Sequence, residues 1–149
     1  MRILKFIISK IVPLDFFSRK YPISIKGVIV LNERIILLKN EREEWELPGG
    51  KIEPNETSEK CLVREIEEEL NIDIEIQVLM DTWFYNILNK VNVFIITFLC
   101  KPINSDTLKI KISVEHKEVG FFSFDEIRRL NMPQGYKNSI YKAFKILDK

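Results

Sequence analysis

The spacing of apolar and polar residues along the chain changes character near residue 24. Before that point, apolar residues recur at helical spacing over residues 2–12 and end at Pro13, which predicts a short amphipathic helix. Basic residues flank the apolar stripe, so this helix suits either a membrane surface or packing against its own domain. We favour packing, and interpret residues 1–20 as an N-terminal appendage to a main domain at residues 21–149.

From residue 24 onward the pattern is typical of strands interleaved with helices. The predicted strands are a buried hairpin over 25–38, a short strand from Trp45, an alternating strand over 73–80, a buried central strand over 91–100, an alternating strand over 108–114 and a last strand over 119–124. In the 73–80 strand, one face would carry Ile74, Ile76, Val78 and Met80, and the aromatic residues 83–85 would follow the strand. The predicted helices are 57–70, a short helix through Leu130 that opens with a capping box at Ser123, and 137–148.

This order of elements predicts one α/β domain with a mixed β-sheet and helices on both faces. A chain of 149 residues with 46% apolar residues can bury a core of its own. No repeat, linker or low-complexity tract divides it.

Composition excludes several classes of function. With 23 Lys and Arg against 22 Asp and Glu, the net charge is +1, so no nucleic-acid partner is expected from electrostatics. Two Cys and one His are too few for a four-ligand zinc site or a disulfide framework, and they suit a reducing, cytoplasmic setting. The five Gly allow neither a dinucleotide fingerprint nor a P-loop. The longest apolar run, 93–100, is too short for a transmembrane segment.

The helix predicted over 57–70 carries the most informative chemistry. Thr57 suits its N-cap and Glu59 its first turn, while Leu62, Val63, Ile66 and Leu70 would form a stripe facing the core. Glu65, Glu68 and Glu69 lie at i, i+3 and i+4 on an adjacent face, where like charges repel. A solvated acidic face is the simpler interpretation. A hard cation such as Mg²⁺ would relieve the repulsion, because it prefers carboxylate oxygens.

The segment 50–72 resembles the defining box of the Nudix hydrolases. That box runs G, five residues, E, seven residues, R-E, an aliphatic residue, any residue, E-E, any residue, G and an aliphatic residue. Its positions are filled here by Gly50, Glu56, Arg64, Glu65, Ile66, Glu68, Glu69 and Ile72. Asn71 replaces the second glycine, and Asn is the next most tolerant residue for the left-handed cap expected there. The approach Trp45-Glu-Leu-Pro-Gly-Gly is also similar to the family's, and the order of elements is similar over about 24–148.

The resemblance implies a Nudix-like α/β/α sandwich with a mixed β-sheet. It further implies that Mg²⁺ or Mn²⁺ is held by Glu65, Glu68, Glu69 and the main-chain carbonyl of Gly49. Arg64 would orient a catalytic carboxylate and pair with Glu56. The general base that takes a proton from the attacking water stays open between Glu65 and a residue on a distant loop, Glu115 or Glu118; we favour Glu115.

The activity implied by the resemblance is hydrolysis of the diphosphate in a nucleoside diphosphate linked to another moiety. A nucleoside triphosphate pyrophosphohydrolase is the alternative enzyme, and a catalytically silent nucleotide-sensing module is the alternative from another class. The partner would be a small nucleotide, and a homodimer stays open. Cys61 is interpreted as a buried filler and His116 as incidental. Lys51 suits either a phosphate contact or an exposed surface position, and the aromatic residues 83–85 suit either base stacking or packing.

Overall fold

The computed structural model describes residues 18–103, 110 and 118–148. In chain order the elements are the strands and helices β1 (Ile23–Leu31), β2 (Arg34–Lys39), β3 (Trp45–Glu46), α2 (Ser58–Leu70), β4 (Ile74–Ile87), β5 (Val91–Pro102), β6 (Glu118–Phe122), α3 (Phe124–Ile127) and α4 (Gln134–Leu147). The predicted interleaving of strands and helices is confirmed within these residues.

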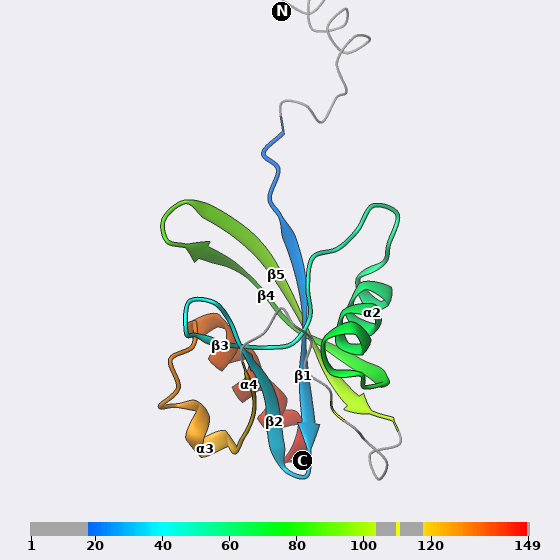
Figure 1. Cartoon of the computed structure of the whole chain (residues 1–149), viewed down its shortest axis with the longest axis vertical. Coiled ribbons are helices and arrows are strands. Elements are labelled where there is room, and N and C mark those ends of the chain that lie inside the picture. The colour runs from blue at the N-terminus through cyan, green and yellow to red at the C-terminus, as the bar shows by residue number, and fades with distance from the viewer. Residues whose placement is uncertain (1–17, 104–109, 111–117, 149) are drawn as a thin grey trace, which may run out of the picture.

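Five strands of the mixed sheet follow the order β3-β2-β1-β5-β4. The sixth strand, β6, lies off this path and pairs with β2. Strands β1 and β5 run parallel over seven residue pairs, whereas β4–β5 and β2–β6 are antiparallel. The pairing of β1 with β2 is confined to the hairpin turn, at Val30–Ile35 and Leu31–Arg34. The two strands therefore separate beyond the turn, as Figure 1 shows.

The edge of β1 that β2 leaves open is taken up by the segment after β3. Ile25 and Gly27 donate backbone hydrogen bonds to the carbonyls of Gly50 and Pro48, at 2.8 and 3.0 Å. Ile52 in turn donates to the carbonyl of Ile23 at 3.2 Å. The Gly49-Gly50 turn is thereby attached to a strand at the centre of the sheet, which fixes it as a rigid part of the fold.

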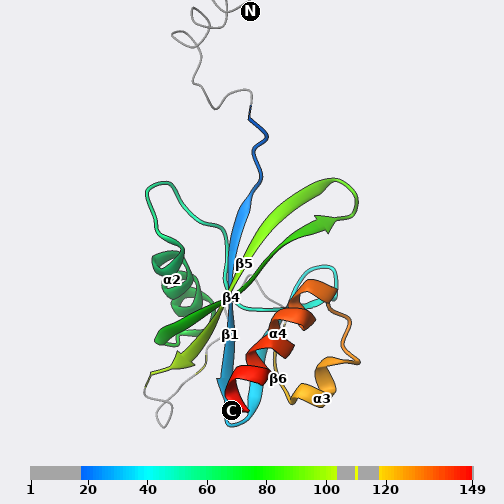
Figure 2. The ribbon, with the colours of Figure 1, turned by 180° about the vertical axis from the view of Figure 1, so that it is seen from behind.

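Two apolar cores lie on opposite faces of the sheet, one under α2 and the other under α4 (Figures 1 and 2). On β1 the alternation divides Ile25 and Ile29, which pack toward α2, from Val28, which packs toward α4. Tyr136 and Ile140 of α4 are almost fully buried in the second core. This arrangement is an α/β/α sandwich with a mixed sheet, so the predicted fold class is confirmed.

Strand β4 differs from its prediction in length and in phase. It runs on to Ile87, so the aromatic residues 83–85 lie within it. Register shifts against β5 occur between Ile76 and Val78 and between Leu79 and Asp81. Each extra residue turns the following side chains to the other face. The expectation of one shared face was therefore wrong: Ile74 and Ile76 pack with the α2 core, Met80 with the α4 core, and Val78 is exposed.

The ends of the two C-terminal helices also differ from their predicted bounds. The capping box at Ser123 is present, but α3 ends at Ile127. Helix α4 begins three residues before the predicted start, with Pro133 at its N-cap. The helix predicted over 2–12, the strand predicted over 108–114, Glu115 and His116 lie outside the described residues. Within the described part of the chain, no helix is long and apolar enough to cross a lipid bilayer.

Candidate active site and metal centre

Helix α2 is capped at both ends in the predicted way. The hydroxyl of Thr57 accepts a hydrogen bond from the backbone N–H of Lys60, and Glu59 lies in the first turn, where the helix dipole favours an acid. At the other end Asn71 has φ 56° and ψ 43°, and its N–H donates to the carbonyl of Glu67 at 2.8 Å. The left-handed cap therefore forms with Asn in place of the glycine.

One face of α2 is fixed against the sheet. Leu62, Ile66 and Leu70 are fully buried in the core under the helix, as predicted. Val63 is 37% exposed, so its assignment to the core stripe was wrong. It lies one position past Leu62, about 100° round the helix, and therefore turns away from the stripe that the i+4 series defines. Anchoring this stripe turns the acidic residues of the helix toward the Gly49-Gly50 turn.

The two glycines of this turn bring the backbone close to α2. Gly49 has φ +123°, which L side chains rarely adopt, and a Cβ there would lie 2.1 Å from the carbonyl oxygen of Ile25. A Cβ on Gly50 would lie 2.3 Å from the carboxyl carbon of Glu65. The absence of side chains at both positions is what allows the carboxylates of α2 to approach the main chain.

Glu69 makes the most direct contact between α2 and this turn. Its side chain is buried, with 6% of the residue exposed, and its Oε2 accepts a hydrogen bond from the N–H of Gly49 at 2.8 Å. The same peptide residue carries the carbonyl assigned to the metal. Glu69, one predicted metal ligand, thus holds Gly49, whose carbonyl is another predicted ligand.

Arg64 links three acidic side chains of the box. Its Nε and Nη2 donate to the two carboxylate oxygens of Glu56 at 2.9 and 3.0 Å, and its Nη1 donates to Glu65 at 2.8 Å and to Glu68 at 3.4 Å. The hydrogen bonds from Arg64 and from the backbone N–H of Glu53 lower the pKa of Glu56 to about 2. Glu56 also raises the pKa of Arg64. The predicted pairing of Arg64 with Glu56 is confirmed, and Arg64 also contacts Glu65, one of the carboxylates that it could orient.

The three predicted metal-ligating carboxylates lie side by side on α2 but do not close around one point. Glu69 is buried, Glu65 is partly buried beside Gly50, and the side chain of Glu68 is 61% exposed. Over residues 18–103, 110 and 118–148, no three Asp, Glu, His or Cys side chains are grouped closely enough to hold a metal ion. The donors nevertheless fit a hard divalent cation, because all are oxygens and a cation already lies at the Gly49 carbonyl.

That cation is Lys26, which sequence reasoning missed. It lies on β1 with 6% of its surface exposed, and its Nζ donates to the carbonyl oxygen of Gly49 at 2.6 Å. Glu46 of β3 lies 3.8 Å from the same nitrogen. The available signal was a lysine between Ile25 and Gly27, inside a run whose neighbours are apolar. A charge in a buried strand needs polar or charged partners, and those of Lys26 are the Gly49 carbonyl and Glu46.

Of the two loop candidates for the general base, only Glu118 lies in the described residues. It is the first residue of β6, pairs in register with Lys39 of β2, and lies 3.7 Å from the Lys39 ammonium. Its place at the start of β6 makes it a strand residue rather than the loop residue that was expected. The assignment of the base to Glu115 stays a prediction.

The remaining candidates are packed into the fold. Cys61 is fully buried and burial raises the pKa of its thiol to about 12, as suits the predicted filler. Trp83 packs edge-on against Tyr136, with ring centroids 4.9 Å apart. Tyr85 donates from its hydroxyl to Glu44 at 2.9 Å, whereas Phe84 points to the opposite face and is exposed. Packing therefore accounts for Trp83, and Tyr85 lies at the edge of the same aromatic group.

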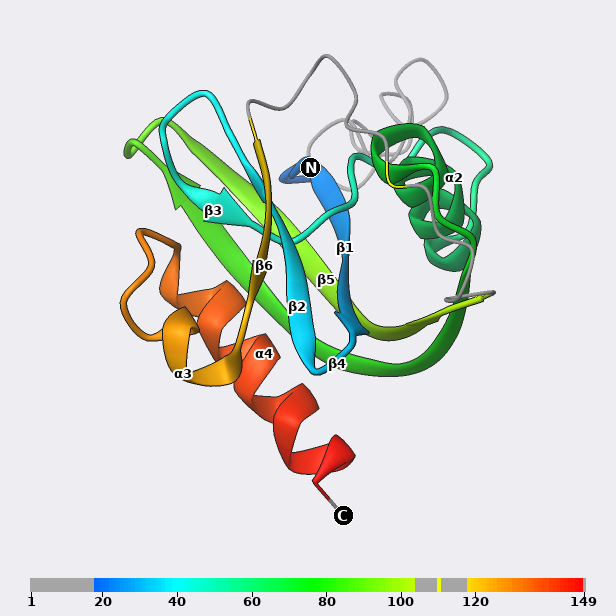
Figure 3. The same ribbon diagram turned by 60° about the horizontal axis from the view of Figure 1, so that its bottom comes forward.

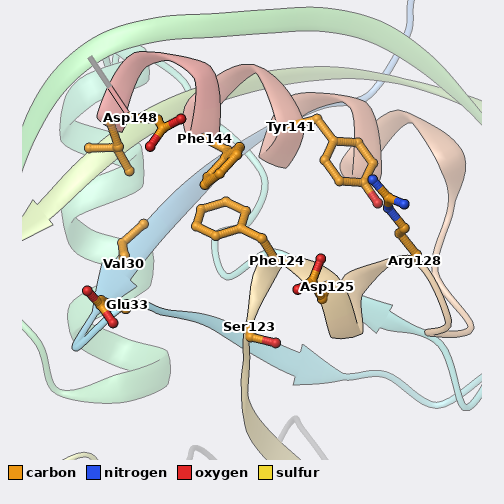
Figure 4. A pocket seen from close by; sticks show the side chains of 10 residues that line it. Val30, Glu33, Ser123, Phe124, Asp125, Arg128, Tyr141, Phe144 and Asp148 are labelled. Carbon is orange, nitrogen blue, oxygen red and sulfur yellow. The ribbon is translucent and has the colours of Figure 1, made fainter.

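A separate cavity of about 500 Å³ lies between the β1–β2 turn and helices α3 and α4. Phe124 and Phe144 face each other there, and Arg128 and Tyr141 lie at one end (Figure 4). None of its lining residues comes from the segment 50–72. Figure 3 shows α3 and α4 well away from α2, so this cavity is distinct from the candidate site.

Comparison with known proteins places the chain in a family. Residues 21–143 match the family model described as NUDIX domain. A MutT-like protein of Streptomyces ambofaciens is 30% identical over 109 residues, which cover 72% of this chain and 67% of that protein. The chain belongs to the Nudix hydrolase family, whose members act on phosphorus-containing anhydrides. The predicted membership is confirmed.

Two other relatives match over smaller shares of their length. An 8-oxo-dGTP diphosphatase of Proteus vulgaris is 55% identical over 38 residues, or 26% of this chain and 34% of that protein. The mRNA-decapping enzyme subunit 2 of Saccharomyces cerevisiae is 28% identical over 122 residues, which cover 77% of this chain but 12% of the yeast protein. The chain thus spans a minor part of both proteins.

Solved structures share the fold. The MutT protein of Methanosarcina mazei Go1 has a TM-score of 0.74 at 22% identity, covering 89% of this chain and 99% of its own. A UDP-X diphosphatase has a TM-score of 0.73 at 20% identity, covering 97% of this chain and 71% of its own. At these identities the likeness concerns the fold alone.

Proposed function

We propose that this protein is a Mg²⁺- or Mn²⁺-dependent pyrophosphohydrolase that cleaves the diphosphate of a nucleoside diphosphate linked to another moiety. The observation that carries the proposal is the buried contact between Glu69 and the Gly49 peptide, which joins the acidic helix to the glycine turn. The hydrogen bond from the Gly49 N–H holds the Glu69 carboxylate beside the residue whose carbonyl is another proposed ligand, and Mg²⁺ prefers such oxygen ligands.

In this proposal Glu65, Glu68, Glu69 and the Gly49 carbonyl hold the metal. When bound, the metal supplies charge neutralisation for the phosphoryl oxygens and acidifies a water molecule. The repulsion among three neighbouring carboxylates is relieved by the same cation, so binding and stability are coupled. Glu68 has an exposed side chain that can reorient at small cost.

The remaining residues of the box orient the site. Arg64 holds Glu65 at 2.8 Å and is itself held by both oxygens of Glu56, so the guanidinium is pinned between loop and helix. Such pinning fixes the geometry of Glu65 before substrate binds, which is how positioning lowers a barrier. The proton of the attacking water is taken by a carboxylate, for which Glu115 is our assignment and Glu118 and Glu65 are the alternatives.

A nucleoside triphosphate pyrophosphohydrolase is the second candidate. Two relatives carry the name 8-oxo-dGTP diphosphatase, and they match at 55% over 38 residues and at 49% over 45 residues. These short matches cover about a quarter of the chain each. They support the same anhydride-cleaving chemistry in this protein and the two relatives more than they support the same substrate nucleobase.

A panel assay separates the candidates. NDP-sugars, ADP-ribose, dinucleoside polyphosphates and nucleoside triphosphates are each incubated with the protein and Mg²⁺, and the products are identified by ion-exchange chromatography. A nucleoside monophosphate with a phosphorylated remainder from an NDP-linked compound supports the first candidate. Pyrophosphate released preferentially from a triphosphate supports the second. No product from any member of the panel, at any of several Mg²⁺ or Mn²⁺ concentrations, would contradict both.

A small nucleotide is thus the proposed partner. A cytoplasmic location completes the proposal, because Cys61 and Cys100 are both buried free thiols, as suits a reducing compartment.

A further inference from the structure

Lys26 is a charged side chain built into the central strand pair of the sheet. Its neighbours Ile25 and Gly27 donate backbone hydrogen bonds to Gly50 and Pro48, so Lys26 stands opposite Gly49 across the strand edge. On its other edge Lys26 pairs in register with Thr97 of β5, which is fully buried. The backbone of Lys26 is therefore fixed on both sides, and only its side chain can move.

The contacts of the Lys26 side chain suit a charged ammonium. The carboxylate of Glu46 lies 3.8 Å from its Nζ and supplies the opposite charge. The short hydrogen bond of Lys26 to the Gly49 carbonyl, at 2.6 Å, is a charge-assisted contact. A positive charge thus lies 2.6 Å from the oxygen assigned to the metal.

A divalent cation and an ammonium at one carbonyl oxygen repel each other strongly at the effective dielectric of a protein. We propose that Lys26 is a resident counter-cation that holds the Gly49 carbonyl in the metal-free protein and must release it when metal binds. Lys26 thereby weakens metal binding to the free protein. This inference rests on the metal site of the proposed function and names a residue outside the Nudix box that tunes it.

Glu46 is the partner that the Lys26 ammonium would keep after it leaves the Gly49 carbonyl. Its carboxylate lies 3.8 Å from the Lys26 ammonium and its side chain is only partly exposed. Glu46 also accepts from the side-chain amide of Asn40 at 3.3 Å, which helps to fix it on β3. A displaced ammonium therefore finds an opposite charge within a small rotation of its own side chain, and no buried charge is left without a partner.

The test is a Mn²⁺ titration of the protein without nucleotide. The electron paramagnetic resonance signal of free Mn²⁺ measures how much metal stays unbound at each step. Lys26→Met removes the ammonium at similar side-chain length and is expected to tighten Mn²⁺ binding about tenfold. Lys51→Met is the matched control, because it removes the same charge from an exposed lysine beside the glycine turn. Its affinity is expected to change less than about threefold, since an exposed charge is screened.

Two further measurements show whether a change in Mn²⁺ affinity comes from misfolding of the variant. Lys26→Met leaves Glu46 without its cation, so the double variant Lys26→Met/Glu46→Gln is compared with Glu46→Gln alone, and the same tightening is expected. Mn²⁺ should also raise the melting temperature of Lys26→Met more than that of wild type, because tighter binding stabilises more.

The outcomes separate the two claims. Wild type that binds Mn²⁺ while Lys26→Met and the double variant bind it equally or more weakly would overturn the role of Lys26 and leave the metal site standing. Wild type that binds no Mn²⁺, and whose melting temperature does not respond to it, would overturn the metal site and this inference together.

Discussion

Arg64 donates hydrogen bonds to both carboxylate oxygens of Glu56, from Nε at 2.9 Å and from Nη2 at 3.0 Å. Glu56 precedes α2 and Arg64 lies in its middle, so this paired contact ties the loop to the helix that carries the acidic cluster. The remaining guanidinium nitrogen of Arg64, Nη1, donates a hydrogen bond to Glu65. Order in the loop and order at a candidate catalytic carboxylate are therefore coupled through one guanidinium.

The pKa of Glu56 gives the contact a pH signature. Because the folded-state pKa is lowered to about 2 from 4.5, folding is favoured by this group above pH 4.5 and the benefit is lost as pH falls toward 2. The melting temperature of wild type should therefore fall between pH 5 and pH 2.5 more steeply than that of Glu56→Gln. Glu53→Gln, in the same exposed loop, serves as the control and should keep the wild-type slope. Equal slopes for wild type and Glu56→Gln would refute the coupling.

The left-handed conformation of Asn71 predicts an order of stabilities. Asn71→Gly should leave the free energy of unfolding equal or raise it by a few tenths of a kcal/mol, because glycine adopts φ 56° without strain. Asn71→Ala should lower it by about 1 kcal/mol. Urea denaturation followed by circular dichroism gives both values. An alanine variant as stable as wild type would show that the cap is not strained for L residues.

Helix α2 and the site at its face were the most predictable parts of the molecule. The i+4 series of Leu62, Ile66 and Leu70 fixed which side is buried, and the cap residues fixed both ends. The pairing of Arg64 with Glu56 followed from the family's pattern. Local periodicity and local capping chemistry carry this information, so no long-range contact had to be known.

Long-range pairing decided what the sequence could not. The register shift between Ile76 and Val78 in β4 turned Met80 to the opposite core, and nothing in the alternating pattern of residues 73–80 indicates it. Lys26 was missed for a related reason. Its importance depends on Gly49 lying across the edge of β1, 23 residues away, where β2 has left the strand.

Gly50 tests whether the close approach of the turn to α2 is needed. Gly50→Ala would place a methyl group 2.3 Å from the carboxyl carbon of Glu65, so Glu65 must move. We expect kcat to fall by about tenfold or more, because a small displacement of a positioned group is costly. Cys100→Ala, in the core under α2, controls for general destabilisation and should keep kcat. Unchanged kcat in Gly50→Ala would place the reacting atoms elsewhere.

The general base is tested by a pair of matched substitutions. Glu115→Gln should lower kcat by about 10²-fold or more with little change in metal affinity, because an amide cannot accept the proton. Glu118→Gln removes the same charge from the start of β6, where Glu118 is engaged with Lys39, and should have a smaller effect. A larger loss in Glu118→Gln would reverse the assignment. Rates near wild type in both variants would return the role to Glu65.

The central claim is that Glu69 and its neighbours on α2 bind the metal on which hydrolysis depends. Glu67→Gln provides the comparison, since it makes the same change on an exposed residue of the same helix. The decisive measurement is kcat on the best substrate of the panel as a function of Mg²⁺ concentration, for wild type, Glu69→Gln and Glu67→Gln, with excess EDTA as the endpoint. We expect EDTA to abolish turnover, Glu69→Gln to lose about 10²-fold or more in kcat, and Glu67→Gln to match wild type. Turnover that persists in EDTA, or a fully active Glu69→Gln, would contradict the account.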